Sequence, residues 1–462
     1  MKVCLVNPPR FKGIPVIRED RCENADRDCV HPPTSLVYIG GVLRELGHDV
    51  TLIDANGLNL TYPQLEKLLR KIKPRWVIFR STPSTFYWDY KTATISKKLK
   101  CYTLMLNWNL HFARDIIETK YWDIDVYWNR YHYEYAIPQI IEKYPYYPRD
   151  NYPSTWDIPT PIWNQIPTFN IYYTRTRLLT PWAVVRGSKG CPYHCRFCVD
   201  AETGWYPRSP ELIGEELEYL VKKRKVRYVS FFDNTFEINP DWCLQIADQI
   251  EKRNLRFKWY INSRADLICK HGIKFFKRLK EVGLDGSSIG IEFGSQEILD
   301  KSGKGTTVKQ NYESIKILKK VGVKTYVSCM IGYLGETKEQ MIQTYRFIKE
   351  SKPTGFQINI VIPYESTLLY QDAVKSGVIK KTQNLDWRGL SCVPTDVVPV
   401  QLSKLPINEI ISLRKQMYKK LYFSTWLLHN LFSIRNFSDL KLGIGYFVSS
   451  VGRIIKGVTF SH

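Results

Sequence analysis

The stretch RGSKGCPYHCRFCVD, residues 186–200, decides both the fold and the chemistry of this chain. It follows the apolar run WAVV (182–185), which predicts a buried strand. Within it, Cys191, Cys195 and Cys198 have a C-x3-C-x2-C spacing. Because the loop is so short, all three sulfurs can reach one soft metal centre. The sequence therefore predicts a metal site on a loop that follows a strand.

Two kinds of metal site are compatible with three cysteines. A structural zinc ion needs a fourth ligand, and His194 is an awkward one because it stands between two of the cysteines. A four-iron cluster held by three thiolates instead leaves one iron open for a substrate or cofactor. We therefore favour a [4Fe-4S] cluster over zinc. A structural role for the cysteines, in a protein that is not an enzyme, stays a third possibility.

The other eight of the eleven cysteines lack ligand spacing and are interpreted as buried or inert thiols. They are Cys4, Cys22, Cys29, Cys101, Cys243, Cys269, Cys329 and Cys392. The chain start, MKVCLVNPPR, lacks the layout of a signal peptide, and no apolar run is long enough to span a bilayer. We expect a cytoplasmic protein, and peripheral binding to the inner face of the membrane is compatible with this sequence.

From residue 181 onward, strands and helices alternate regularly. Six strands and five intervening helices predict an open portion of a β/α barrel, a partial (β/α)6 fold, over residues 181–400. In barrels of this kind the chemistry lies at the carboxyl ends of the strands. The predicted strands are Trp182–Arg186, Arg227–Phe232, Phe257–Ile261, Gly286–Glu292, Lys324–Ile331 and Gly355–Ile362. The predicted helices are Glu211–Lys225, Pro240–Asn254, Ile273–Val282, Val308–Val321 and Lys338–Ser351.

Residues 1–145 show a second alternation that predicts a doubly wound α/β domain with a mostly parallel sheet. Its predicted elements are strand Lys2–Asn7, helix Thr34–Leu46, strand Asp49–Ile53, helix Gln64–Ile72, and strands Trp76–Phe79 and Tyr102–Leu106. Residues 146–180, rich in Pro, Tyr and Trp, predict an extended linker because each proline interrupts helices and ladders.

Basic residues outnumber acidic ones in the whole chain and, more strongly, in residues 411–462. Lys and Arg number 67 against 45 Asp and Glu, a net charge of +22, which favours an anionic partner. Residues 401–462 form a basic tail, and from residue 411 it has eight Lys or Arg, nine aromatics and a single acid, Asp439. Such composition predicts helices lying on an anionic membrane surface. The alternative is a C-terminal helix that packs on the barrel.

The cysteine motif after the first strand of a β/α barrel resembles the radical SAM superfamily, and Phe197 fits the same pattern. The resemblance implies that the open iron binds S-adenosylmethionine (SAM). One electron then cleaves SAM to methionine and a 5′-deoxyadenosyl radical, which abstracts hydrogen from an unactivated carbon. It also implies a low-potential electron donor of the ferredoxin or flavodoxin type.

The resemblance implies SAM-binding residues at the ends of the later strands. Asp233 and Asn234, in FFDNTF, would hold the methionyl amine, although many relatives have two acids there. Arg264 would meet the methionyl carboxylate, and Glu292 the ribose hydroxyls. Within SCMIGYLGET, Gly332 begins GYLGET, which is similar to the superfamily's G-x-P-G-E-T turn except for leucine in place of proline. The alternative for each residue taken alone is a turn or a surface charge, and their common location at the strand ends favours the binding role.

The two-domain layout resembles one branch, in which a cobalamin-binding-type domain precedes the barrel. This branch includes anaerobic porphyrin cyclases, hopanoid methylases and archaeal enzymes that modify tetraether lipids. Cobalamin itself is uncertain: D-x-H-x-x-G is absent, and Trp108, Trp128 and Tyr131 would crowd the cofactor's loop. We favour a degenerate domain without cobalamin.

The favoured function is radical modification of a membrane lipid or isoprenoid, by ring formation, C–C bond formation or headgroup modification. With cobalamin bound, methylation of an inert carbon becomes the leading reaction. RNA modification suits the charge, but we find no appended RNA-binding module, and nucleic acid is the less favoured partner.

Overall fold

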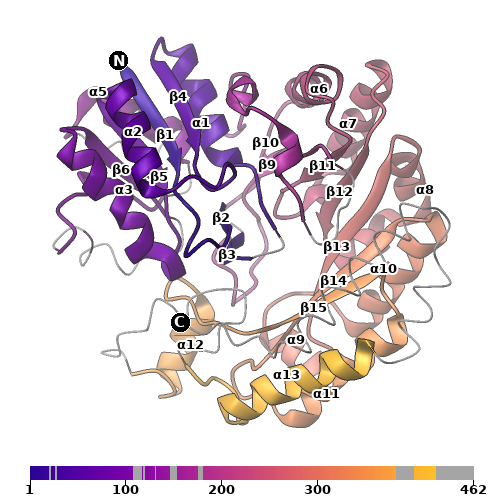
Figure 1. Ribbon diagram of the computed structural model, residues 1–462. Coiled ribbons are helices and arrows are strands. Elements are labelled where there is room, and N and C mark those ends of the chain that lie inside the picture. Colours follow the sequence, from indigo (N-terminus) through magenta and orange to yellow (C-terminus); the bar gives the residue numbers. More distant parts are fainter. Residues whose placement is uncertain are drawn as a thin grey trace. The chain divides into compact units, whose positions relative to one another are not determined.

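The structure is a computed structural model that describes residues 1–19, 22–26, 29–107, 117, 120–130, 132–145, 153–174, 180–380 and 400–422. It divides into two compact units (Figure 1). Unit 1 comprises Met1–Tyr173 and Tyr206–Lys225, and unit 2 comprises Thr174–Trp205 and Val226–His462. This division into two units does not test the domain boundaries expected from the sequence, which stay predictions.

A five-stranded parallel sheet forms the centre of unit 1, in the order β4-β1-β5-β6-β7. Its strands are β1 (Lys2–Asn7), β4 (Asp49–Asp54), β5 (Trp76–Arg80), β6 (Tyr102–Leu106) and β7 (Val126–Trp128). β5 is buried along its whole length, as expected for a parallel strand covered on both faces. The doubly wound fold predicted from the sequence is confirmed.

The remaining elements of unit 1 surround this sheet. Its described helices are α1 (Thr34–Glu45), α2 (Tyr62–Ile72), α3 (Phe86–Lys98), α5 (Tyr133–Lys143) and α6 (Pro210–Glu218). Short turns of helix cover Pro83–Thr85, Trp163–Gln165, Phe169–Ile171 and Tyr219–Lys223, and short strands are β2 (Val16–Glu19), β3 (Cys22–Ala25) and β10 (Tyr206–Pro207). The antiparallel β2–β3 hairpin lies inside the β1–α1 connection and was not predicted.

Helix α6 belongs to unit 1 although it follows the first barrel strand in sequence. One contact that holds it there is made by the carboxylate of Glu216, which is buried with three partners. Glu216 accepts hydrogen bonds from Tyr38 Oη (3.1 Å) and Trp163 Nε1 (2.7 Å) and forms an ion pair with Arg208. A buried charge is stable only with such partners, so they fix α6 to α1 and to the Pro-rich segment.

A six-stranded parallel sheet forms the centre of unit 2, in the order β15-β14-β13-β12-β11-β8. Its strands are β8 (Trp182–Val185), β11 (Tyr228–Phe231), β12 (Lys258–Ser263), β13 (Leu284–Glu292), β14 (Lys324–Ile331) and β15 (Gly355–Ile360), and β9 (Ser188–Lys189) is a short strand after β8. Each strand pairs with its neighbours in sequence order, which is the topology of an open barrel. The predicted partial β/α barrel is confirmed.

Helices connect these strands. They are α7 (Pro240–Lys252), α8 (Ala265–Glu281), α9 (Gln296–Lys301), α10 (Val308–Val321), α11 (Lys338–Ser351), α12 (Leu368–Lys375) and α13 (Ile407–Tyr422), with a 3-10 turn at Phe236–Ile238. α10 begins where Thr307 Oγ1 accepts the Gln310 N–H and ends at Gly322, whose φ of 77° is left-handed. α8 begins earlier than the predicted Ile273 because Gly272, with a φ of 71°, kinks the helix rather than starting it.

The described part of the basic tail packs on the barrel. On α13, Tyr418 Oη accepts the N–H of Ile358, and its ring stacks on Phe356 of β15 at 5.4 Å. This matches the alternative interpretation for residues up to 422, while residues 423–462 lie outside the described part. Among the described helices, none combines the length and apolar character needed to span a bilayer.

Candidate functional site

The cysteine loop lies at the carboxyl end of β8 and has a defined backbone. The N–H of Cys191 donates to Thr203 Oγ1 (3.1 Å), and the N–H of Cys198 donates to the carbonyl of Cys195 (3.0 Å). Gly190, with a φ of 82°, precedes the first cysteine; a Cβ there would lie 2.4 Å from the carbonyl oxygen of Gly204. The loop therefore requires glycine at this position to bring the cysteines together.

The three thiols lie close enough to influence one another. Cys195 is 8% exposed, and burial, followed by the charge of Asp200, raises the pKa of Cys198. The thiols of Cys195 and Cys191 raise the Cys198 pKa further, so the three cannot comfortably ionise together without a cation. Three neighbouring thiolates are the donor set of an iron–sulfur cluster, and these residues fit that group.

A single metal ion has different requirements from a cluster. Among the residues that the structure describes, no three His, Cys, Asp or Glu side chains are arranged to hold one metal ion. Cysteines that bind a four-iron cluster each bind a different iron atom and need not converge on one point. The structure thus adds no support for the zinc alternative.

Arg264, predicted to meet the SAM carboxylate, lies against the cysteine loop. Its Nη1 is 3.8 Å from Cys195 Sγ, and its guanidinium lies 3.6 Å from the ring centre of Tyr193. Nε and Nη2 donate to the two carboxylate oxygens of Asp266, at 3.1 and 3.2 Å. Arg264 is therefore held by the chain itself, and its contact with SAM stays a prediction.

Asp233, predicted to hold the methionyl amine, is fully buried at the end of β11. Its Oδ1 accepts the Ser188 hydroxyl (2.6 Å) and its Oδ2 accepts the Gly187 N–H (3.1 Å). Burial raises its pKa to about 6, against the lowering effect of these hydrogen bonds. Asp233 thus fixes the turn that leads into the cysteine loop. Asn234 lies beside it, half-buried, and the SAM contact of both residues stays a prediction.

Glu292 lies at the end of β13 and pairs with Lys304. Lys304 Nζ donates to Glu292 Oε1 at 2.9 Å, and both side chains are buried. Burial alone would lower the pKa of Lys304, but Glu292 and then Cys195 raise it overall. Glu292 has a left-handed φ of 63°, at an irregularity in the β13–β14 register. Such strain in a non-glycine residue is typical of functional sites.

The remaining two predicted residues frame the site. Phe197 packs edge-on against Phe293, with ring centres 6.4 Å apart. Gly332 has a φ of 87°, and its N–H donates to Glu336 Oε2 at 2.5 Å, as does the N–H of Tyr333 at 2.9 Å. Burial raises the pKa of Glu336 to about 7. The turn after β14 is therefore built as the motif predicts, although its ligand contact is untested.

Sequence reasoning missed two groups in this neighbourhood. Tyr193 lies within the cysteine motif, and its ring supports Arg264. Glu237 is buried, accepts the backbone N–H of Arg264 at 2.8 Å, and has a pKa raised to about 8 by burial. The position of Tyr193 between two cysteines was a usable signal, but no sequence pattern pointed to Glu237.

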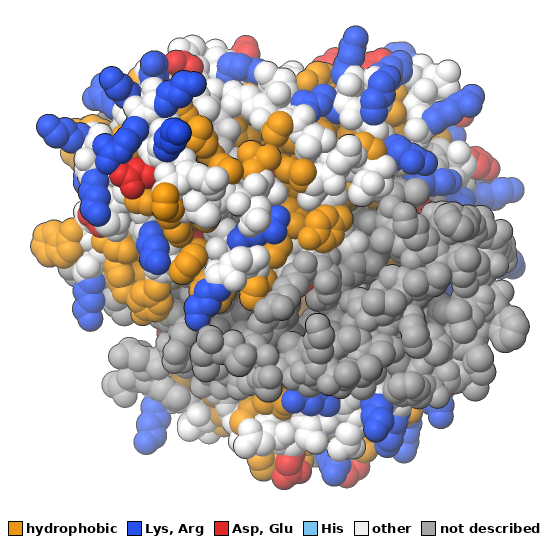
Figure 2. All heavy atoms as spheres, viewed as in Figure 1, with side chains coloured by type: hydrophobic (Ala, Val, Ile, Leu, Met, Phe, Trp, Pro, Cys, Tyr) orange, Lys and Arg blue, Asp and Glu red, His pale blue; other side chains and the backbone are white. Residues whose placement is uncertain are grey.

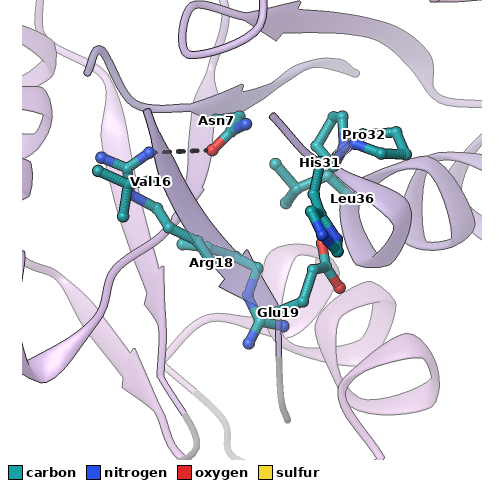
Figure 3. Close-up of a pocket in the computed structure, with 9 residues that line it drawn as sticks. Asn7, Val16, Arg18, Glu19, His31, Pro32 and Leu36 are labelled. Carbon is teal, nitrogen blue, oxygen red and sulfur yellow. Dashed lines mark hydrogen bonds between the residues drawn. The ribbon is translucent and has the colours of Figure 1, made fainter. Parts of the chain in front are cut away.

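Unit 1 has a small pocket at the carboxyl edge of its own sheet (Figure 3). Asn7 at the end of β1 and Arg80 at the end of β5 line it, at the point where the strand order reverses. This is where open α/β sheets bind ligands. The other lining residues, which come from the β1–α1 connection and the start of α1, are Val16, Arg18, Glu19, His31, Pro32, Pro33 and Leu36.

The polar groups at this edge contact one another. Arg18 forms two hydrogen bonds with the carboxylate of Asp89, at 2.7 and 3.1 Å. It donates a third to Asn7 Oδ1 at 3.2 Å (Figure 3). Asn7 Nδ2 donates to Asp54, and the carboxylate of Glu19 accepts the N–H and hydroxyl of Ser35 at the start of α1. The polar side chains of the β1–α1 connection are therefore paired within unit 1.

The pocket of unit 1 is too small to hold cobalamin. Its interior leaves essentially no space for even a water-sized sphere, whereas sites that enclose drug-sized ligands measure roughly 300–1,000 Å³. A corrin ring is larger than such ligands, so this pocket does not fit it. Trp128, predicted to crowd the cofactor, is buried in β7, while Trp108 and Tyr131 lie outside the described residues.

Residues 185–348 match the model of the Radical SAM superfamily. An uncharacterized methyltransferase of Pyrococcus horikoshii is 27% identical over 92% of this chain and 93% of its own. The anaerobic magnesium-protoporphyrin IX monomethyl ester cyclase of Cereibacter sphaeroides is 24% identical over 86% of this chain and 68% of its own.

Solved structures show the same two-domain fold. The cobalamin-dependent S-adenosylmethionine radical enzyme OxsB, with aqua-cobalamin and S-adenosylmethionine bound, superposes with a TM-score of 0.72 at 15% identity. The match covers 97% of this chain and 70% of that one. The radical S-adenosylmethionine methyltransferase TsrM of Kitasatospora setae, with cobalamin and a [4Fe-4S] cluster bound, gives 0.63 at 15% identity over 90% and 81% of the two chains.

Proposed function

Since the chain contains a radical SAM domain and is a radical SAM enzyme, we propose that it modifies an unactivated carbon of a membrane lipid. The observation that carries the chemistry is the cysteine loop, placed at the carboxyl edge of the barrel sheet beside buried Arg264 and Lys304. When bound, a [4Fe-4S] cluster supplies the electron that cleaves SAM to methionine and a 5′-deoxyadenosyl radical able to abstract hydrogen.

The residues of this chain have distinct tasks in the proposed reaction. Cys191, Cys195 and Cys198 hold the cluster, and Asp233 fixes the turn that enters their loop. Glu292 and Lys304 form a buried pair that offers one carboxylate and one ammonium group to a polar cofactor. Their low exposure keeps water from the site, which protects a radical from side reactions.

The chemistry is tested by anaerobic reconstitution with iron and sulfide, followed by addition of SAM and dithionite. We expect 5′-deoxyadenosine and methionine in equal amounts from the intact protein. Cys198→Ala should form neither, whereas Cys269→Ala, which changes a half-buried thiol elsewhere in the same unit, should behave as wild type. Intact protein that binds iron but never cleaves SAM would contradict the proposal.

The lipid substrate rests on charge, on the tail and on one relative. The chain has a net charge of +22, and Lys and Arg side chains are scattered over the coloured part of the face seen in Figure 2. Basic residues near an anionic membrane each add about 1 kcal/mol of attraction. The hopanoid C-3 methylase of Methylococcus capsulatus is 22% identical over 52% of this chain. In a flotation assay, the full chain should rise with anionic vesicles. It should stay at the bottom of the gradient when the vesicles are left out.

Two outcomes are compatible with this radical chemistry. Ring or C–C bond formation is the first candidate, and the resemblance to a protein named as a cyclase supports it. Methyl transfer is the second candidate, supported by the full-length resemblance to the Pyrococcus protein named as a methyltransferase. Lipid mass spectrometry of cells with and without the gene separates them, as loss of two hydrogens or gain of a CH₂ unit.

RNA modification is the outcome that would replace the lipid proposal. A tRNA-2-methylthio-N(6)-dimethylallyladenosine synthase of Protochlamydia amoebophila is 24% identical over 55% of this chain. Purified protein that carries nucleic acid, shown by its absorbance ratio, and that does not float with vesicles would favour this function. An unchanged lipid profile in the deletion strain would point the same way.

A further inference from the structure

One N–H group of Arg264 points at the sulfur of a cysteine in the loop. Arg264 Nη1 lies 3.8 Å from Cys195 Sγ, which is within the range of an N–H···S hydrogen bond. The Arg264 side chain is only 4% exposed, so solvent does not weaken this contact. A cation and a directed donor thus lie next to a cluster ligand.

The guanidinium is held from several sides, which fixes the direction of this donor. Nε and Nη2 bind the carboxylate of Asp266, and Nη2 also donates to the carbonyl of Lys304 at 2.7 Å. The ring of Tyr193 covers one face of the guanidinium at 3.6 Å. Because the planar group is preorganised, little conformational entropy opposes the contact with Cys195.

We propose that Arg264 is a positioning residue that raises the reduction potential of the cluster bound through Cys195. This inference rests on the proposed function, since it requires the cluster. Reduction adds negative charge that spreads onto the cysteine sulfurs. A hydrogen bond to such a sulfur stabilises the reduced cluster more than the oxidised one, so the cluster accepts an electron more readily.

The direct hydrogen bond and the net charge can be separated. The negative charge of Asp266 balances the positive charge of Arg264, so the pair has no net charge. Its effect on the cluster is then that of the hydrogen bond to Cys195. The double variant Arg264→Met/Asp266→Asn keeps this neutrality but removes the donor. Arg264→Lys keeps the charge but loses the planar group that Tyr193 and Asp266 hold.

The test is a redox titration of the reconstituted full chain, with the reduced cluster measured by electron paramagnetic resonance. It is made without SAM, so that any role of Arg264 in binding SAM does not contribute. For the double variant we expect about a tenfold weaker affinity for the electron, which is a midpoint about 59 mV more negative. Arg264→Lys should give a smaller shift of the same sign.

Arg278→Gln is the matched control, because Arg278 is also paired with acids, Asp248 and Glu251, but on the surface of α7 and α8. Its midpoint should equal that of wild type. A double variant with full iron content and a wild-type midpoint would overturn the inference. If the double variant binds no iron, Arg264→Lys and Tyr193→Leu decide, and wild-type midpoints in both overturn it.

Failure of the proposed function would look different. In that case wild-type protein would bind no cluster, or would not cleave SAM, whatever residue stands at position 264. Failure of this inference alone leaves SAM cleavage intact and the midpoint potential unmoved.

Discussion

The carboxyl edges of the two parallel sheets differ in how their polar groups are used. In unit 1 the edge is filled by the chain itself, since Arg18 binds Asp89 and Glu19 binds the first turn of α1. In unit 2 the edge presents three cysteines next to Arg264 and the Glu292–Lys304 pair. We call the first the self-satisfied edge, because its polar groups bind one another. We call the second the equipped edge, because it presents groups that can hold a cofactor. The two edges share the α/β architecture and differ in their loops.

The largest expected effect comes from removing a thiol at the equipped edge. Cys195→Ala should abolish 5′-deoxyadenosine formation and lower the iron content, because the cluster loses one of its three ligands. The fold of unit 1 does not depend on this thiol, so its unfolding should be unchanged. Iron analysis and product chromatography check the first part, and hydrogen exchange of unit 1 the second. If Cys195→Ala still forms 5′-deoxyadenosine, the proposed difference between the two sheet edges is wrong.

At the self-satisfied edge, a substitution should change stability instead. Arg18→Leu leaves the carboxylate of Asp89 buried without its cation, which costs about 3–5 kcal/mol. Arg18→Leu/Asp89→Leu should recover most of that loss, because the pair is then replaced by apolar groups. Chemical denaturation of the wild type and both variants measures this. Equal stability of Arg18→Leu and wild type would contradict the account.

A pH effect is expected from Glu237 in unit 2. Its pKa is raised from 4.5 to about 8 by burial, so the fold favours the protonated acid. Its contribution to stability is complete below pH 4.5 and is lost as the pH rises toward about 8. Each pH unit in this window costs up to about 1.4 kcal/mol.

Glu237→Gln mimics the protonated acid and should therefore flatten the pH dependence of stability. The variant should match wild type at low pH and exceed it at pH 8. Thermal unfolding at several pH values is the measurement. Parallel profiles for the two proteins would show that Glu237 stays ionised in the fold.

The smallest effects are expected at helix starts, where a hydroxyl side chain caps a helix in each of the two units. Ser209 Oγ accepts the Leu212 N–H at the start of α6 in unit 1, and Thr307 Oγ1 accepts the Gln310 N–H at the start of α10 in unit 2. Ser209→Ala and Thr307→Ala should each cost about 1 kcal/mol. Neither should change SAM cleavage, and a large activity loss in either variant would link that helix to the site.

The sequence predicted the strands well because parallel strands buried on both faces are continuous apolar runs. β1 and β14 begin and end where the hydrophobic pattern placed them. The same logic collected the candidate residues, since the carboxyl ends of parallel strands meet at one edge. The superfamily assignment followed from three cysteines with an uncommon spacing and is confirmed by the match over residues 185–348.

What the sequence could not predict depends on side-chain packing between distant segments. The Arg264 guanidinium contacts Tyr193 and Cys195 from another strand end, and nothing in NSRAD indicates that direction. Helix α6 joins unit 1 through contacts such as those of Glu216 with Tyr38 and Trp163. The β2–β3 hairpin was missed because its short strands carry charged residues without an alternating pattern.

Binding of SAM at a vacant coordination position of a three-cysteine cluster is the claim on which the other conclusions depend. The most direct measurement is the electron paramagnetic resonance spectrum of the reduced, reconstituted protein before and after SAM is added. We predict a reduced [4Fe-4S] signal whose g values shift on addition of SAM. A zinc-bound protein with no such signal, or a cluster spectrum that SAM leaves unaltered, would contradict the account.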